Sequence, residues 1–208
     1  MAQIDRKINE HRFVFGSEYT HANNIRAFLR NSESIGNKTL MEGYAKSLIS
    51  SNTVIMERLL GREDRLNSSE RADVDNAARE SMMLAEKYSK SEAPKFAKAI
   101  IENAKQWVSD LASDDRIEDA ANAIRKGLYP AEKYGKPEDV RLFAMMLVKA
   151  DEYIVNKYAQ DKKHPLEHDL ALAEMIAVAS KYNMANALKK AQEMAPITTS
   201  PLDRLQRV

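Results

Sequence analysis

The sequence predicts an all-α fold, in which antiparallel helix hairpins stack as a short helical-repeat array behind an N-terminal helical region. Three observations lead to this prediction. The 208 residues include only 6 glycines and 6 prolines, while 44% are hydrophobic and 30% are charged, which is a globular composition with few turns. Apolar residues recur with the helical period along almost every long segment. One helical pattern also occurs three times at a similar spacing.

Residues 1–61 are predicted to form the N-terminal helical region. Alternation of apolar and polar residues occurs only briefly, in "HRFVFGSEY", and favours either an extended arm at 1–16 or a loop ahead of a helix at about 17–31. A helical stripe follows, and a single polar residue, Asn52, interrupts it. The apolar members of the stripe are Met41, Ala45, Leu48, Ile55 and Leu59.

Residues 62–195 are predicted to form three helix hairpins. Two further apolar stripes indicate helices: Phe96, Ile100, Ala104, Trp107, Val108 and Leu111, and then Val140, Phe143, Leu147, Ala150 and Ile154. Helix starts are indicated by Pro137, which precedes two acidic residues, and by the capping boxes Asn67-x-x-Glu70 and Asp115-x-x-Glu118. Pro130 is expected to kink or split its helix.

The internal repetition is carried by three segments that align without gaps: "DNAARESMMLAEKY" (75–88), "ANAIRKGLYPAEKY" (121–134) and "DLALAEMIAVASKY" (169–182). Each ends in Ala-x-Lys-Tyr, and the final tyrosines are 46 and 48 residues apart. After each segment comes a short polar joint and a second helix, so the period fits a helix hairpin. A chance similarity of common helix residues is the alternative.

The repeat also predicts how the hairpins pack. The small side chains of Ala85, Ala131 and Ala179 suit a close helix crossing, which the tyrosine that follows would cover at its end. In architecture the spacing resembles the helical arrays of the tetratricopeptide and HEAT class. The period is longer than that of the former and the signature of the latter is absent, so no family is predicted.

The tail at 196–208 differs in composition, with Pro, Thr and Ser ahead of a small amphipathic end. A mobile terminus is expected. A short docking peptide for another chain is the alternative.

The stretch "HPLEHDLALAE" (164–174) contains the H-x-x-E-H motif of one class of zinc peptidases. Pro165 is typical of a first helical position and disfavours helical backbone at His164. The two histidines of the motif, His164 and His168, then no longer project side by side from one helix, as zinc binding requires. We expect a helix start and no metal.

Other chemistry finds little support in the sequence. The chain has no cysteine, which excludes disulfides, thiol catalysis and cysteine-ligated zinc. His11 and His21 lie near Arg12 and could serve an RNase-like site, although a surface histidine is the simpler interpretation. Glu18 and His21 form only one of the two Glu-x-x-His pairs of a di-iron bundle. No catalytic residue and no cofactor are predicted.

Charge and hydropathy restrict the classes of partner and the cellular location that we expect. Lys and Arg total 32 against 31 for Asp and Glu, so the chain has almost no excess of positive charge for a nucleic-acid backbone. A nucleic-acid partner is therefore disfavoured. The longest apolar runs, such as "LFAMMLV" at 142–148, are too short to span a bilayer, and the N-terminus has no secretory pattern. We expect a soluble, cytoplasmic protein without a membrane partner.

The predicted function is that of a non-catalytic scaffold or adaptor that binds a protein or peptide on its helical repeats. The candidate binding residues recur once per repeat: Lys87, Tyr88, Lys133, Tyr134, Lys181 and Tyr182. One alternative is a nucleic-acid-associated protein whose three lysines contact the phosphate backbone. The other is an enzyme with a dispersed site near His11 and His21.

Overall fold

The computed structural model describes residues 2–62, 64–159 and 165–195, with side chains from Glu18 onward. Every regular element in these ranges is helical, so the predicted all-α class is confirmed. The elements are α1 (Ala2–Ser34), α2 (Lys38–Leu60), α3 (Ser68–Tyr88), the short 3₁₀ helix η1 (Lys90–Glu92), α4 (Ala93–Ser113), α5 (Ile117–Tyr134), α6 (Pro137–Tyr158), α7 (Pro165–Lys181) and α8 (Ala185–Met194).

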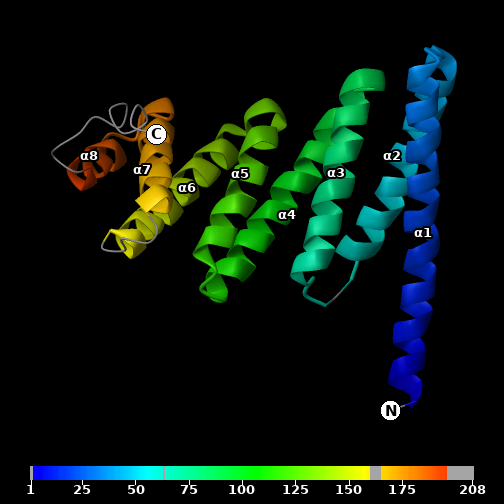
Figure 1. The fold of residues 1–208 in the computed structure, drawn as a ribbon, viewed down its shortest axis with the longest axis horizontal. Helices are drawn as coiled ribbons and strands as arrows, with labels where there is room; N and C mark the ends of the chain where they lie inside the picture. The colour runs from blue at the N-terminus through cyan, green and yellow to red at the C-terminus, as the bar shows by residue number, and fades with distance from the viewer. Residues whose placement is uncertain (1, 63, 160–164, 196–208) are drawn as a thin grey trace. The chain divides into compact units, whose positions relative to one another are not determined.

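The chain divides within α4 into two compact units, unit 1 (Met1–Asn103) and unit 2 (Ala104–Val208). In unit 1, α1 packs against α2 and α2 packs against α3 (Figure 1). In unit 2, α5 packs against α6, α6 against α7 and α7 against α8 (Figure 1). Within each unit, helices that follow one another in sequence are therefore neighbours in space.

The apolar stripes seen in the sequence form the interior of the two units. In unit 1, Ala45 and Leu48 of α2 pack with Ala22, Ile25 and Leu29 of α1. In unit 2, the α6 stripe is buried from Phe143 to Ile154. Burial of these faces is the main source of stability, at roughly 25 cal/mol per Å² of apolar surface.

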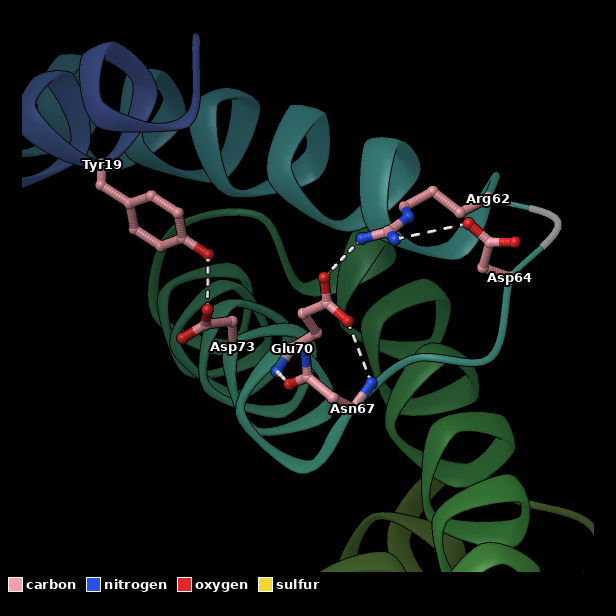
Figure 2. Close-up of polar contacts among 6 residues, drawn as sticks. All are labelled: Tyr19, Arg62, Asp64, Asn67, Glu70 and Asp73. Carbon is pink, nitrogen blue, oxygen red and sulfur yellow. Dashed lines mark hydrogen bonds and ion pairs between the residues drawn. The ribbon is translucent and has the colours of Figure 1, made fainter. Parts of the chain in front are cut away.

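The start of α3 shows why that helix begins where it does (Figure 2). The side chain of Asn67 accepts a hydrogen bond from the Glu70 N–H at 3.0 Å, and the Glu70 carboxylate accepts one from the Asn67 N–H at 2.9 Å. The predicted capping box is thus confirmed. The other carboxylate oxygen of Glu70 binds Arg62, just after α2, so the same residue ties the end of α2 to the start of α3.

The two proline signals are confirmed as helix starts. Pro137 is the first residue of α6, where the Asp139 carboxylate accepts a hydrogen bond from the Lys136 N–H at 3.2 Å. Pro165 is the first residue of α7, as expected from the "HPLEH" stretch. His164 itself lies outside the described residues.

The predicted capping box at Asp115 is wrong. Asp115 has a φ of 56°, and the N–H of the next residue, Arg116, donates to the Leu111 carbonyl at 2.8 Å. This is the left-handed turn that commonly ends a helix, here α4, and Asp is one of the few side chains that tolerate it. Because Asp115 is used to end α4, the N-cap position of α5 falls to Arg116.

Two further expectations are corrected. The chain is helical from Ala2, so there is no extended arm at 1–16, because the short alternating stretch is outweighed by the helix-favouring residues around it. Helix α5 runs without a break through Pro130 and is not split. Pro130 removes one hydrogen-bond donor, but only one turn of α5 follows it. The tail at 196–208 lies outside the described residues.

The three alanines of the Ala-x-Lys-Tyr pattern share one environment. Ala85, Ala131 and Ala179 are all fully buried. The lysine two positions after each alanine is exposed, and the tyrosine after that is half-buried. The pattern therefore marks the same local arrangement at the ends of α3, α5 and α7.

A closer helix contact occurs at Gly127 of α5. A Cβ at this position would lie 2.6 Å from Phe143 Cζ of α6 and 2.8 Å from Ala104 Cβ of α4, both impossible distances. The absence of a side chain at Gly127 therefore allows α5 to pack tightly in unit 2. Gly43, in the second turn of α2, is the opposite case, because its Cβ would meet no atom within 4 Å.

Substitution of the two glycines by alanine should change the free energy of unfolding in opposite directions. Gly127→Ala should destabilise the protein by about 1–3 kcal/mol, because the overpacking outweighs the better helix propensity of alanine. Gly43→Ala should stabilise it by about 0.5–1 kcal/mol. Urea unfolding followed by circular dichroism measures both. Equal effects of the two substitutions would contradict the close packing at Gly127.

The buried alanines give a second prediction. Ala85→Leu, Ala131→Leu and Ala179→Leu should each lower the free energy of unfolding by about 1–3 kcal/mol through overpacking. Ala177→Leu is the control, because Ala177 is exposed on α7, and its effect should stay within about 0.5 kcal/mol. An effect of similar size at Ala177 would show that the burial of the three alanines is not what matters.

Candidate functional site

In unit 1, a bidentate ion pair joins α1 to α3 across the face of α2. Arg26 Nε donates to Glu80 Oε1 at 2.7 Å, and Arg26 Nη2 donates to Glu80 Oε2 at 2.6 Å. The remaining Arg26 amino group donates to Asn23 Oδ1 at 2.7 Å. A guanidinium that meets a carboxylate in this way fixes both the distance and the rotation of the two helices.

The middle helix completes this cluster through Asn52, the residue that interrupts the α2 stripe. Asn52 is fully buried, and its Nδ2 donates to Glu80 Oε2 at 2.8 Å. Burial alone would raise the pKa of Glu80, but the hydrogen bonds from Arg26 and Asn52 outweigh burial and hold the pKa below its usual value. We call Asn23, Arg26, Asn52 and Glu80 the unit 1 clamp.

Unit 2 contains a cluster of the same design. Arg125 Nε of α5 lies 2.9 Å from both carboxylate oxygens of Glu174 on α7, and Arg125 Nη1 donates to Asn122 Oδ1 at 2.7 Å. The middle helix α6 contributes Asp151, whose Oδ1 lies 3.5 Å from Arg125 Nη2. We call Asn122, Arg125, Asp151 and Glu174 the unit 2 clamp.

The clamps belong to two ladders of polar contacts that have the same spacing. In unit 1, Tyr19–Asp73, Arg26–Glu80 and Glu33–Lys87 each join α1 to α3, and successive rungs are seven residues apart on both helices. In unit 2, Arg125–Glu174 and Glu132–Lys181 join α5 to α7 with the same step. Since residue numbers rise together on both sides, the joined helices run in the same direction.

The clamps were missed in the sequence, although a signal for them exists. "ANNIRAFLRNSE" (22–33) and "ANAIRKGLYPAE" (121–132) share Ala, Asn, Ile, Arg, Leu and Glu at the same positions, 99 residues apart. The same offset relates Asn52 to Asp151, and an offset of 94 relates Glu80 to Glu174. Residues 1–61 were predicted to lie outside the repeats, so the similarity of 22–33 to 121–132 did not contribute to the prediction.

The two clamps differ at one buried position. Asp151 replaces the amide of Asn52 with a carboxyl group that is fully buried, and its oxygens accept no hydrogen bond from the described residues. Burial, and then the charge of Glu174, raise the pKa of Asp151 to about 8, although Arg125 acts in the opposite direction. At neutral pH Asp151 therefore keeps its proton, and only in that form can it donate toward Glu174 as Asn52 donates to Glu80.

An open cleft of about 380 Å³ lies beside the unit 2 clamp. This volume falls within the range of roughly 300–1,000 Å³ that is usual for ligand sites. Its apolar lining consists of Ile154, Leu170, Ala171 and the ring of Tyr158. Its polar lining consists of Glu118, Asn122, Arg125, Glu167 and Glu174. We call it the α5–α7 cleft.

Unit 1 has different side chains at the positions that correspond to this cleft. Tyr19 stands where unit 2 has Glu118, and its ring spans from α1 to α3, where the hydroxyl donates to Asp73 at 2.8 Å (Figure 2). In unit 2 Glu118 instead accepts hydrogen bonds from Lys157 and the Tyr158 hydroxyl, both at 2.7 Å. The shorter side chain leaves space between α5 and α7.

The lysines and tyrosines predicted as binding residues are engaged within the protein. Lys87 Nζ lies 3.0 Å from Glu33, and Lys181 Nζ lies 2.6 Å from Glu132. Each of the three lysines also lies over the ring of the tyrosine that follows it: Lys87 over Tyr88 at 5.0 Å, and Lys133 over Tyr134 and Lys181 over Tyr182 at 5.4 Å. Lys157 and Tyr158 end α6 in the same way, a pair that the sequence analysis missed.

The described histidine side chains, His21 and His168, lie on different helices, α1 and α7. His21 is exposed on α1, His168 Nδ1 lies 3.0 Å from Asp169 Oδ1, and the side chain of His11 lies outside the described residues. In the described ranges, no group of three His, Asp or Glu side chains has the geometry to hold a metal ion. Nor is any helix there long and apolar enough to cross a membrane.

No family model matches this sequence, and no curated protein is similar to it beyond the level expected by chance. The assignment of function therefore rests on the geometry of the clamps and the cleft.

The difference between the clamps predicts a pH effect on stability. The pKa of Asp151 is about 8 in the folded protein and about 3.9 in an unfolded chain. Its stabilising effect is therefore full below about pH 4 and is lost as the pH rises to about 8. Asp151→Asn should remove this dependence, so the variant should gain stability relative to the unmodified protein between pH 5 and 9.

The matched variant is Asn52→Asp, which places a buried carboxyl group beside Glu80. It should introduce the same loss of stability with rising pH into unit 1. Urea midpoints of all three proteins at pH 5, 7 and 9 give the comparison. If the midpoint differences stay constant with pH, Asp151 does not have a raised pKa in the folded protein.

Proposed function

We propose that this chain is a non-catalytic protein-binding protein that holds a peptide segment of its partner in the α5–α7 cleft. The observation that carries the proposal is the cleft itself, where Leu170 is 61% exposed beside a rim of polar groups. An exposed apolar anchor surrounded by polar groups is the usual composition of a peptide-binding site.

The helical architecture supports the same function. We infer that the hairpins are copies of one unit, because 22–35 aligns with the three segments 75–88, 121–134 and 169–182 and thus adds a fourth copy. Arrays of helix hairpins present the side chains of successive first helices as a binding surface. Here α5 and α7 are such first helices, and the cleft lies between them.

Catalysis is not part of the proposal. The described residues that line the cleft do not include serine, threonine, cysteine, histidine or lysine. Its arginine and one of its glutamates bind each other, and Glu118 is held by Lys157 and Tyr158. These contacts position helices and do not leave a reactive group.

A nucleic-acid-binding protein is the second candidate, and the lysine geometry counts against it. Lys87 and Lys181 each pair with a glutamate, so a phosphate would have to displace an intramolecular partner. The near balance of 32 basic against 31 acidic residues points the same way.

The proposal predicts that a displayed library of random 12-residue peptides will yield binders of the purified protein. Leu170→Lys should weaken their binding at least about tenfold, because it removes the apolar anchor and adds a charge. Fluorescence polarisation with labelled peptides measures the affinity.

The control is Tyr153→Lys, because Tyr153 is 43% exposed on α6 and does not line the cleft. It should leave the affinity within about twofold. The absence of any binder, or binders that lose the same affinity in both variants, would show that the cleft is not a peptide site.

A further inference from the structure

The two units place different chemistry at corresponding positions. In unit 1 these positions hold Tyr19, Asn52 and Asn76, and in unit 2 they hold Glu118, Asp151 and Leu170. Unit 2 thus has acids at two positions where unit 1 has neutral polar side chains, and an apolar side chain where unit 1 has an amide. A third acid, Glu167, corresponds to Asp73, which Tyr19 binds in unit 1.

We infer that the α5–α7 cleft takes a lysine or arginine side chain of the partner peptide, next to an apolar residue. This inference rests on the proposed function and names the chemistry of the segment bound. The cationic head would lie among Glu118, Glu167 and Glu174, while its aliphatic stem would pack on Leu170 and Ile154.

Charge complementarity favours a cation over an anion. Three glutamates line the cleft, and two cations that contact them are already bound: Lys157 to Glu118, and Arg125 to Glu174 and Asn122. The lining therefore keeps an excess of carboxylates. An acidic or phosphorylated peptide would meet the three carboxylates with no guanidinium edge left to receive it. A basic side chain would meet carboxylates that can each accept further hydrogen bonds.

Asp151, beside the cleft, gives an independent observation in favour of a cation. Its buried carboxyl group faces Arg125 of α5 at 3.5 Å and Glu174 of α7, both of which line the cleft. Its oxygens receive no hydrogen bond from the described residues, whereas the corresponding Asn52 donates its Nδ2 to Glu80 at 2.8 Å. Above about pH 8, where Asp151 is ionised, a cation beside Glu174 would offset the repulsion between the two carboxylates.

The test uses the full chain and one selected peptide in four synthetic forms, with the central basic residue kept, or replaced by norleucine, glutamine or glutamate. Fluorescence polarisation should show a loss of roughly threefold to tenfold for norleucine and a larger loss for glutamate. The basic form should also weaken as salt rises, whereas the norleucine form should not.

Variants of the protein locate the effect. Glu167→Gln should reduce the preference for the basic over the norleucine peptide by roughly threefold or more. Glu42→Gln makes the same change of net charge at an exposed position of α2 and should leave the preference unchanged. Asp151→Asn should reduce the preference at pH 9, where Asp151 is ionised, and not at pH 6.

The outcomes separate this inference from the proposed function. Peptides that bind and depend on Leu170, but show equal affinity for the basic and norleucine forms, would overturn the cationic specificity and leave the peptide site intact. A preference for the glutamate form would overturn it as well. Failure to find any peptide sensitive to Leu170→Lys would reject the proposed function itself.

Discussion

The bidentate pair between an arginine on one helix and a glutamate two helices later is the interaction on which the rest of the structure depends. In each unit the joined helices, α1 with α3 and α5 with α7, are related through a middle helix that packs against both. Apolar packing alone would tolerate small rotations and shifts of these helices, because it is not directional. The two parallel hydrogen bonds of the guanidinium form in only one alignment of the joined helices. The next polar contact, two helical turns away, requires the same alignment.

Both ion pairs are partly exposed, and such a pair adds little stability, because the ordering of two long side chains and their partial removal from water offset their attraction. Its value here lies in the specification of register, and that role requires the pair to be fully hydrogen-bonded. Unit 1 meets the requirement with the Asn52 amide, whose Nδ2 donates directly to Glu80. The unit 2 clamp can make the corresponding hydrogen bond only when Asp151 is protonated, so its hydrogen bonding depends on pH. The clamp with more unsatisfied hydrogen-bonding groups, in unit 2, is also the clamp beside an open cleft. Proteins tend to keep such groups at binding sites, and this arrangement agrees with that tendency.

The sequence predicted what depends on local patterns and missed what depends on contacts between distant residues. The apolar stripes and the starts at Asn67, Pro137 and Pro165 could be predicted, because periodicity and capping act within a few residues. Asp115 was misassigned because the same residue type can begin a helix or end one, and only the packing of α4 decides between them. The clamps were missed because Arg26 and Glu80 are 54 residues apart, and because Asn52 by itself is only a polar residue in an apolar stripe. The sequence does contain one signal for the clamps: the pattern "AN-x-IR-x-x-L" occurs twice, 99 residues apart. It was not used, because the repeats were defined by the Ala-x-Lys-Tyr pattern.

The position of the cleft connects the packing of unit 2 to the proposed binding. Arg125 and Glu174 both line the cleft and also hold α5 to α7, so a ligand that contacts Glu174 acts on the bond that sets the register of the two helices. In unit 1, Tyr19 lies two turns of α1 before the equivalent pair and donates to Asp73 on α3. Unit 1 is therefore closed by its own side chain at the place where unit 2 leaves room for a side chain from outside. Under the proposed function, corresponding positions would serve as structure in unit 1 and as a binding site in unit 2, and the difference between Tyr19 and Glu118 would be decisive.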